Sequence, residues 1–455
     1  MNLSSEYTED IRSLSGRGAH KRGELFMQKL SGRKLLLIGF TLFSMFFGAG
    51  NVIFPPYLGL GCGREWVLGF LCYYLADIGL ALLAMFAVLR SGSSDAITRP
   101  IGRIPARVLM SAVVLCIGPM LAIPRTAAST YEMSLQPLAS GVSPVVFSVL
   151  FFLVILLLCL RESAVVDIVG KILTPALLLG LLVLIVKGML DPIGPVPDRV
   201  LVDNVVRTGI EAGYQTMDVL AALCFSIIIV ESARKKGYEG RKECSRAMMG
   251  ACGISAVLLL FVYGGLTFLG ATTIDVYPEV TDNAKLLSMI IQDLLGFGGM
   301  VLLGIIVGLA CLTTSIGLTS ATASYFETLF KGKVSYKTLV VVVTVFSFAV
   351  SNIGLNQIIA IASPILSLLY PVVIILVICS FFKDRLLRCY LPGAACLVAF
   401  VITCFDTLHS TFGMNFSFLE MLPLDSMGLG WVLPAVIGGL IGFFVPRKAK
   451  AAEEA

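Results

Sequence analysis

Charged residues are scarce in this sequence: they make up 14% of its 455 residues, against roughly 25% in soluble domains. Histidine occurs only twice, at His20 and His409, outside the long apolar runs, which argues against a histidine proton relay. A GxxxxGK[ST] phosphate loop is absent, and the apolar runs hold neither a Ser-His-Asp set nor a metal-ligand set. These absences argue against an ATP-driven pump and an intramembrane enzyme, and predict no organic cofactor.

Apolar residues are abundant, at 57% of the chain with a mean hydropathy of +0.93, and predict an all-α polytopic membrane protein embedded in a lipid bilayer. The apolar runs between charged or Gly/Pro-rich segments predict about twelve spans. These runs are 35–61, 66–89, 107–131, 144–160, 165–188, 207–231, 246–270, 296–323, 338–353, 357–381, 388–405 and 429–446.

The basic residues follow a topological pattern, because most of them fall in every second loop and in the two tails. By the positive-inside rule, the tails 1–34 and 447–455 are both predicted to be cytoplasmic. This asymmetry explains the net charge of +5 without a nucleic-acid partner, and nothing in the chain indicates an obligatory protein partner.

The first span contains a predicted helix break, Phe46-Phe47-Gly48-Ala49-Gly50-Asn51-Val52-Ile53-Phe54-Pro55-Pro56. Its glycines interrupt a helix cheaply, and Pro55 is predicted to lie in the first turn of a second half-helix. Backbone groups freed in mid-membrane are tolerated only where they are buried in protein or line a cavity, and there they can hold ions and charged substrate groups. The stretch therefore predicts a transporter's binding site.

The sixth span contains a second polar stretch, Glu211-Ala212-Gly213-Tyr214-Gln215-Thr216-Met217-Asp218, which predicts a second break. Since the two spans are five apart, they enter the membrane from opposite sides, as in an inverted repeat. The predicted division is a five-helix repeat at 35–190, an inverted repeat at 207–381 and two further helices at 388–446. Before the eighth span, residues 284–294 have the spacing of an amphipathic helix, a candidate outer lid.

The eighth span carries three neighbouring hydroxyls, Thr313, Thr314 and Ser315. Such hydroxyls beside free carbonyls suit Na⁺, although they also commonly bond to their own helix or join two helices.

Ionisable residues in three spans allow further roles. Asp218 is a candidate proton carrier, cation ligand or cap at the second break. Asp77 has no polar neighbours along its span, which favours a structural hydrogen bond over proton transfer. Arg125 either snorkels to the outer surface or pairs across the outer vestibule as a gate.

With these residues in view, the chain resembles the bacterial branched-chain amino acid:cation symporter family. The resemblance rests on Phe47–Pro56, on Gly118-Pro119 with Ala122–Thr126, on Gly213-Tyr214 with Thr216–Asp218, and on Cys311–Thr314. It implies a LeuT-type five-plus-five architecture in a bacterial inner membrane. It also implies import of Leu, Ile or Val together with Na⁺ or H⁺, and the sequence leaves that choice open.

The resemblance implies specific site residues. The cation would lie at the carbonyls near Ser44, Phe47 and Ala310 with the hydroxyls of Thr313 and Thr314; Ser315 is the doubtful member. The substrate carboxylate would meet the N–H groups of Gly48, Ala49, Gly50 and Asn51. The amino group would face carbonyls around Tyr214, Gln215, Thr216 and Met217, and the candidates for the aliphatic pocket are Phe46, Phe54, Met217 and Phe225.

Two alternatives stay open from the sequence. The same fold can carry another small zwitterionic amino acid, or it can serve a membrane sensor that binds an amino acid without transporting it. A competition panel against labelled leucine distinguishes the first alternative from transport of Leu, Ile or Val. Accumulation of substrate against a gradient in proteoliposomes excludes the second.

Overall fold

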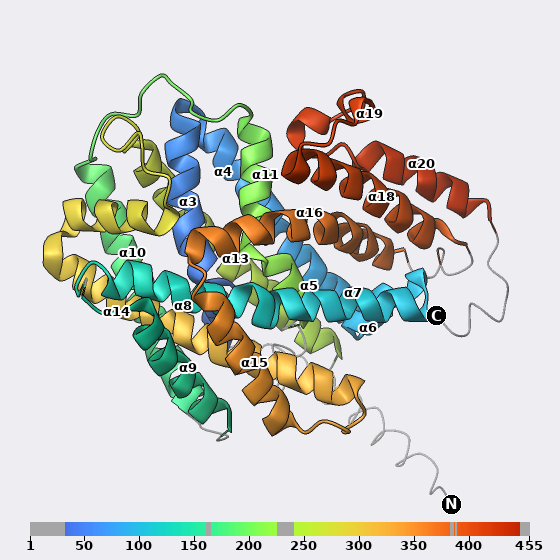
Figure 1. Cartoon of the computed structure of the whole chain (residues 1–455), viewed down its shortest axis with the longest axis horizontal. Coiled ribbons are helices and arrows are strands. Elements are labelled where there is room, and N and C mark those ends of the chain that lie inside the picture. The colour runs from blue at the N-terminus through green and yellow to red at the C-terminus, as the bar shows by residue number, and fades with distance from the viewer. Residues whose placement is uncertain are drawn as a thin grey trace, which may run out of the picture.

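The computed structural model describes residues 32–139, 141–160, 165–224, 241–382, 386 and 389–445, and the regular elements within them are helices (Figure 1). The expectation of an all-α chain is therefore confirmed for the described residues. Most of the tail at 1–34 and all of the tail at 447–455 lie outside them.

The helices follow the predicted apolar runs closely. In chain order the longer ones are α2 (Gly32–Phe46), α3 (Ala49–Cys62), α4 (Trp66–Tyr74), α5 (Leu80–Ser91), α7 (Arg103–Leu115), α8 (Ala122–Thr130), α9 (Pro144–Leu160), α10 (Val165–Leu190), α11 (Val205–Thr216), α13 (Arg241–Ala271), α14 (Asn283–Leu329), α15 (Tyr336–Ser351), α16 (Leu355–Ser380), α18 (Leu391–Phe412) and α20 (Val432–Phe443). The π-helical turns are η2 (Leu75–Gly79), η4 (Cys116–Met120) and η5 (Tyr131–Leu135); the short elements are η1 (Gly63–Glu65), α6 (Ser94–Thr98), η3 (Arg99–Ile101), α19 (Ser417–Glu420) and η6 (Asp425–Met427).

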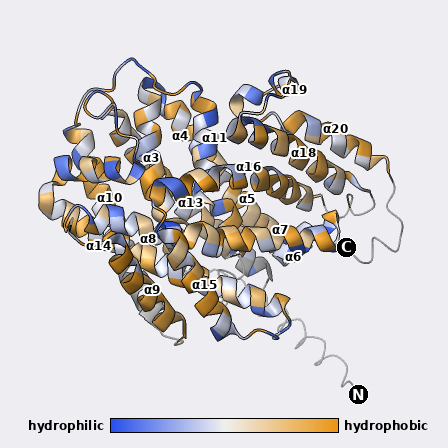
Figure 2. Ribbon diagram, viewed as in Figure 1, coloured by the Kyte–Doolittle hydropathy of each residue, from blue (hydrophilic) through white to orange (hydrophobic). Residues whose placement is uncertain are grey.

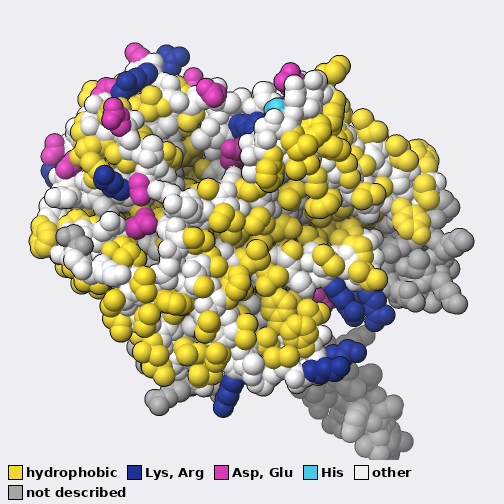
Figure 3. Space-filling view, in the orientation of Figure 1, with side chains coloured by type: hydrophobic (Ala, Val, Ile, Leu, Met, Phe, Trp, Pro, Cys, Tyr) yellow, Lys and Arg dark blue, Asp and Glu magenta, His cyan; other side chains and the backbone are white. Residues whose placement is uncertain are grey.

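Six continuous helical stretches in the described residues are long and apolar enough to cross a membrane, and five shorter apolar helices accompany them. Figure 2 shows hydrophobic residues along most of these helices. In Figure 3, hydrophobic side chains cover much of the visible face, while charged side chains gather at its upper left and along its lower edge. The total of twelve spans and the division into repeats stay predictions.

Close packing of α3 against α13 depends on two glycines. A Cβ atom on Gly59 would lie 1.9 Å from the Thr267 carbonyl oxygen, and one on Gly270 would lie 1.8 Å from that of Pro56. Because any side chain would clash with backbone on the opposite helix, glycine allows the two helices to approach closely. This contact supports the half-helix that follows the first break.

Helix α14 contains a sharp turn that separates two segments predicted from the sequence. Gly296 has φ 67° and ψ −170°, outside the helical region, so the amphipathic segment ends there and the eighth apolar run begins. Asp282 caps the first segment by accepting the Lys285 N–H at 2.9 Å. Ala284, Leu286, Leu287 and Ile290 are buried, as the amphipathic spacing predicts, while the lid role stays a prediction.

Candidate functional site

The first break lies where the sequence places it. Helix α2 ends at Phe46, α3 begins at Ala49, and Phe47 and Gly48 between them are not helical. The expectation for Pro55 is wrong: α3 starts directly after Gly48, so Pro55 and Pro56 lie inside the helix rather than in its first turn. Since proline lacks an N–H, these two residues withhold the usual helical donors from the Asn51 and Val52 carbonyls.

The second break is a single residue. Helix α11 ends at Thr216, Met217 adopts left-handed backbone angles with φ 66°, and helical structure resumes at Asp218. The Met217 N–H donates to the Tyr214 carbonyl at 3.1 Å, which closes the end of α11. Phe225, a candidate for the aliphatic pocket, lies outside the described residues.

Asn51 joins the two breaks through its side chain. Its Nδ2 donates to Asp218 Oδ2 at 2.8 Å and to Tyr263 Oη at 2.7 Å, and its Oδ1 accepts the Gly48 N–H at 3.3 Å. The residue is 1% exposed, so these bonds form away from water. Asn51 therefore fixes the start of α3 against Asp218 and against α13.

Arg125 lies at the interior of the protein, with 4% of its surface exposed, rather than reaching for the membrane surface. Its guanidinium donates to the Gln215 carbonyl and, at 3.3 Å, to the Thr216 carbonyl. It also lies 5.6 Å from the centre of the Phe54 ring, a cation–π distance. Arg125 on α8 thus contacts the end of α11 and a side chain of α3.

Asp77 has a polar neighbour that its own span does not reveal. It is fully buried in η2, and its Oδ1 accepts the Thr216 hydroxyl at 2.8 Å. Thr216 is 139 residues away in sequence. This bond is a structural hydrogen bond of the kind expected for Asp77, supplied by a residue outside its own span, and Asp77 and Asp218 both lie at the second break.

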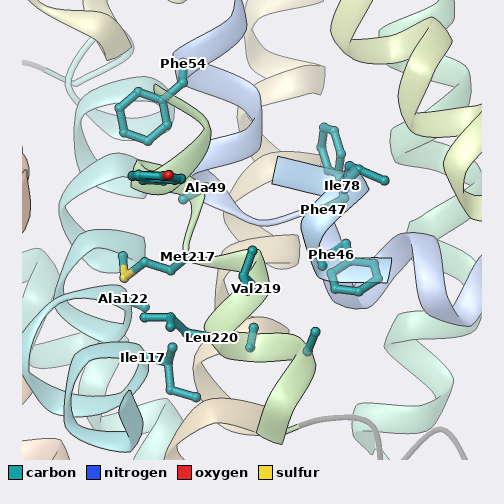
Figure 4. Close-up of a cluster of buried hydrophobic side chains, with 14 of the residues drawn as sticks. Phe46, Phe47, Ala49, Phe54, Ile78, Ile117, Ala122, Met217, Val219 and Leu220 are labelled. Carbon is teal, nitrogen blue, oxygen red and sulfur yellow. The ribbon is translucent and has the colours of Figure 1, made fainter. Parts of the chain in front are cut away.

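A small cavity of about 40 Å³ lies between the breaks. Its polar lining residues are Gly48, Asn51, Arg125, Thr126, Thr216, Asp218 and Thr314, and its apolar ones are Met45, Phe46, Ala49, Ile117, Ala122, Met217, Ala221 and Leu318. In Figure 4, Met217 extends beside Ala122 and above Ile117. A cavity of this volume can hold water, because about 10–15 Å³ is enough to admit one molecule.

A second cavity, of about 890 Å³, opens toward the basic loops and shares Ile117 with the first. Arg99, Arg103, Arg107 and Lys331 line it, all from loops predicted to be cytoplasmic. The small cavity and this wider vestibule therefore approach each other at Ile117.

The candidate cation ligands are brought together only in part. Thr314 lines the small cavity with Gly48 and Ala49. The Thr313 hydroxyl donates to the Ala310 carbonyl at 2.9 Å, and Ser315 donates to the Cys311 carbonyl at 2.9 Å and contacts the Thr126 hydroxyl. Ser44, Phe47, Ala310 and Thr313 are not among the residues that line the cavity.

Four aromatic candidates take different positions. Phe46 lines the cavity, whereas Phe54 lies under Arg125. Tyr214 stacks on Tyr370 of α16 with ring centres 4.2 Å apart. Phe47 stacks on Phe43 at 5.2 Å and on Tyr263 at 6.1 Å.

Several residues of the site carry no local signal in the sequence. Tyr263 and Leu318 lie within ordinary apolar runs, and only their contacts across the fold place them here. Gly118, which with Pro119 is part of the family resemblance, has non-helical angles in η4. That pair bends the third span next to Ile117.

A family model described as "Branched-chain amino acid transport protein" matches residues 31–449. The chain belongs to this family of branched-chain amino acid transport proteins. It is therefore an integral membrane transporter rather than an enzyme, and the resemblance found in the sequence is confirmed.

Two relatives from Bacillus subtilis (strain 168) illustrate the family. The branched-chain amino acid permease BraB is 38% identical over 429 residues, covering 90% of this chain and 94% of the relative. The permease BrnQ is 36% identical over 438 residues, covering 92% of this chain and 98% of the relative. A putative branched-chain amino acid carrier protein of Staphylococcus aureus (strain USA300) is 35% identical over 438 residues, covering 90% and 97%.

Solved structures show the fold. An inward-facing conformation of Mhp1 matches with a TM-score of 0.60 at 13% identity, covering 90% of each chain. A substrate-bound, outward-open Na⁺-coupled sialic acid symporter matches with a TM-score of 0.52 at 15% identity, covering 93% of this chain and 98% of the other. The family member described here therefore has the fold of the LeuT-like transporters.

Proposed function

We propose that this chain is a secondary active symporter that imports leucine, isoleucine and valine with Na⁺. The observation that carries the proposal is the cavity between two broken helices, which joins a polar lining to an apolar one in a branched-chain amino acid transport protein. A zwitterion with an aliphatic side chain needs both kinds of lining.

The substrate's charged groups would use the breaks. Its carboxylate would lie at the first turn of α3, where the N–H groups of Ala49, Gly50 and Asn51 have no intrahelical partners and the helix dipole favours a negative charge. Its ammonium group would face Asp218 and the end of α11 at Thr216. The aliphatic side chain would extend toward Ile117 and Ala122.

The cation would bind between the first break and α14. Thr314 is the best supported ligand, because it lines the cavity beside Gly48 and Ala49. Thr313 and the carbonyl oxygens of Ser44, Phe47 and Ala310 complete the proposed set, since Na⁺ prefers oxygen ligands. Binding of the cation would order the first break, and release would follow when the two repeats rock against each other.

Uptake into proteoliposomes that contain only this protein tests the proposal. Labelled leucine is supplied under an inward Na⁺ gradient, under an H⁺ gradient, and under neither. We expect accumulation only with the Na⁺ gradient, and competition by isoleucine and valine. Accumulation with H⁺ alone would transfer the coupling role to Asp77 and Asp218, and binding without accumulation would indicate a sensor.

The ligand set has its own test, the double substitution Thr313→Ala and Thr314→Ala. We expect the Na⁺ concentration for half-maximal uptake to rise at least about tenfold, or about 1.4 kcal/mol, because two oxygen ligands are lost. Thr344→Ala is the control: that hydroxyl donates to the Val340 carbonyl at 2.7 Å on α15, away from the breaks. Unchanged Na⁺ activation in the double variant would refute the site.

A further inference from the structure

The cavity between the breaks is too small for the substrate that its lining suits. A volume of about 40 Å³ is little more than the share of one molecule in liquid water, about 30 Å³, whereas leucine has nine heavy atoms. Binding of an amino acid therefore requires part of the lining to move, and one of the lining side chains is suited to leave. Met217 combines several properties that make it this side chain.

The first property is its backbone. Met217 has φ 66° and is 1% exposed, so a side chain with a Cβ occupies a left-handed position that glycine would take more easily. Hydrogen bonds hold this conformation from both sides: Arg125 binds the Gln215 and Thr216 carbonyls, and the Met217 carbonyl accepts the Ala221 N–H at 2.9 Å. Backbone strain of this kind gathers at functional sites.

The second property is the shape of the side chain. Beyond its Cα atom, methionine has four heavy atoms, as leucine and isoleucine do, and an exchange between methionine and leucine conserves volume in packed interiors. Its unbranched thioether rotates about three bonds and adapts to irregular space. In Figure 4 it lies beside Ala122 and above Ile117, two apolar residues of the cavity lining.

We propose that the Met217 side chain occupies the aliphatic subsite of the substrate-free transporter, and that the side chain of the incoming amino acid displaces it. This inference rests on the proposed function and deepens it. The subsite is matched to side chains of about four heavy atoms. Met217 is then a specificity-determining residue that substitutes for the substrate while the site is empty.

Equilibrium binding of labelled leucine to the purified full-length protein tests the proposal without relying on transport. We expect Met217→Ala to bind leucine about tenfold more tightly, because no side chain has to leave apolar surroundings. We also expect phenylalanine to bind to this variant and not to the wild-type protein. Met217→Leu, with the same number of heavy atoms, should keep wild-type affinity within about threefold.

Controls separate this effect from general loosening of the interior. Met85→Ala removes a buried methionine that packs near Cys252, away from the cavity, and should leave the amino acid preference unchanged. Ala122→Val keeps Met217 and narrows the same subsite from α8, so it should weaken leucine binding more than valine binding. This variant tests the subsite even if Met217→Ala does not fold.

The outcomes are distinguishable. If the wild-type protein binds none of the three branched-chain amino acids, the proposed function fails and this inference fails with it. If the wild-type protein binds leucine but Met217→Ala binds it equally or more weakly, with the same ranking of amino acids, Met217 is only a wall of the site. Tighter leucine binding together with phenylalanine binding supports the displacement.

Discussion

Position 50 shows how a single residue type is dictated by a side chain from another helix. A Cβ atom on Gly50 would lie 2.9 Å from Nη2 of Arg125 and 3.1 Å from the Phe54 ring. Arg125 is buried and donates to two carbonyls at the end of α11, so it cannot retreat without losing those bonds. Glycine at position 50 therefore allows the three elements to meet.

The substitution Gly50→Ala tests this arrangement. We expect leucine uptake to fall at least about tenfold, because displacing a hydrogen bond to a buried charged group costs about 1.5–3 kcal/mol. Gly253→Ala on α13 is the matched control, since a Cβ atom there meets nothing within 4 Å. Initial rates of uptake and the amount of folded protein are measured for both. Wild-type uptake by Gly50→Ala would show that Arg125 moves freely.

Single residues were predictable from the sequence only where the signal was local. The glycines of the first break and the buried Asp218 are visible in short stretches, and the structure places Asn51 beside Asp218. The bond between Asp77 and Thr216 joins residues 139 positions apart, and the bond between Asn51 and Tyr263 joins residues 212 positions apart. Hydropathy patterns hold no information on such pairs.

At the scale of elements, the turn in α14 depends on backbone conformation alone. Gly296 has φ 67° and ψ −170°, a combination essentially restricted to glycine, and a Cβ atom there would meet nothing within 4 Å. Gly296→Ala should destabilise the protein by about 1–3 kcal/mol through strain. A Cβ atom on Gly298, two residues away, would also meet nothing within 4 Å, so Gly298→Ala should change the stability little.

Thermal unfolding of both variants in detergent checks this prediction. We expect a lower midpoint for Gly296→Ala than for Gly298→Ala and the wild-type protein. Equal midpoints would mean that the amphipathic segment and the eighth apolar run can rearrange without strain. A large loss in Gly298→Ala would instead point to a contact of α14 that the turn does not explain.

Whole elements were easier to predict than their interruptions. The apolar run 144–160 coincides with α9, and both breaks fall within the stretches proposed from glycine and polar residues. The π-helical turns η2, η4 and η5 were not predicted, because an extra residue in a helical turn leaves the apolar pattern almost unchanged. Their places are set by tertiary packing, as η2 shows by holding Asp77 against Thr216.

At the scale of the whole molecule, the cavity of about 890 Å³ defines which side of the protein is open. Its basic lining belongs to loops that the positive-inside rule places in the cytoplasm. Ser324 on α14 lines it and is exposed, whereas the cysteines described by the structure are buried or half-buried. Ser324→Cys therefore introduces an accessible thiol in the vestibule.

Labelling with a membrane-impermeant maleimide shows from which side of the membrane the vestibule is accessible. We expect Ser324→Cys to react in inside-out vesicles and to be shielded from the reagent in right-side-out vesicles. Addition of leucine with Na⁺ should slow the reaction as the vestibule closes. The unsubstituted chain gives the background from native cysteines. Labelling from the outside only would reverse the predicted orientation of both termini.

The hydrogen bonds that Asn51 donates affect how tightly transport of the ion is coupled to transport of the amino acid. Moving α3 relative to Asp218 and α13 would break the two bonds that Asn51 Nδ2 donates, to Asp218 and to Tyr263, at about 1–3 kcal/mol for each buried group left without a partner. An amino acid in the cavity offers new partners, but an ion alone offers few. We therefore expect transport of the ion without an amino acid to be slow, because the hydrogen bonds of the Asn51 carboxamide oppose the movement of α3.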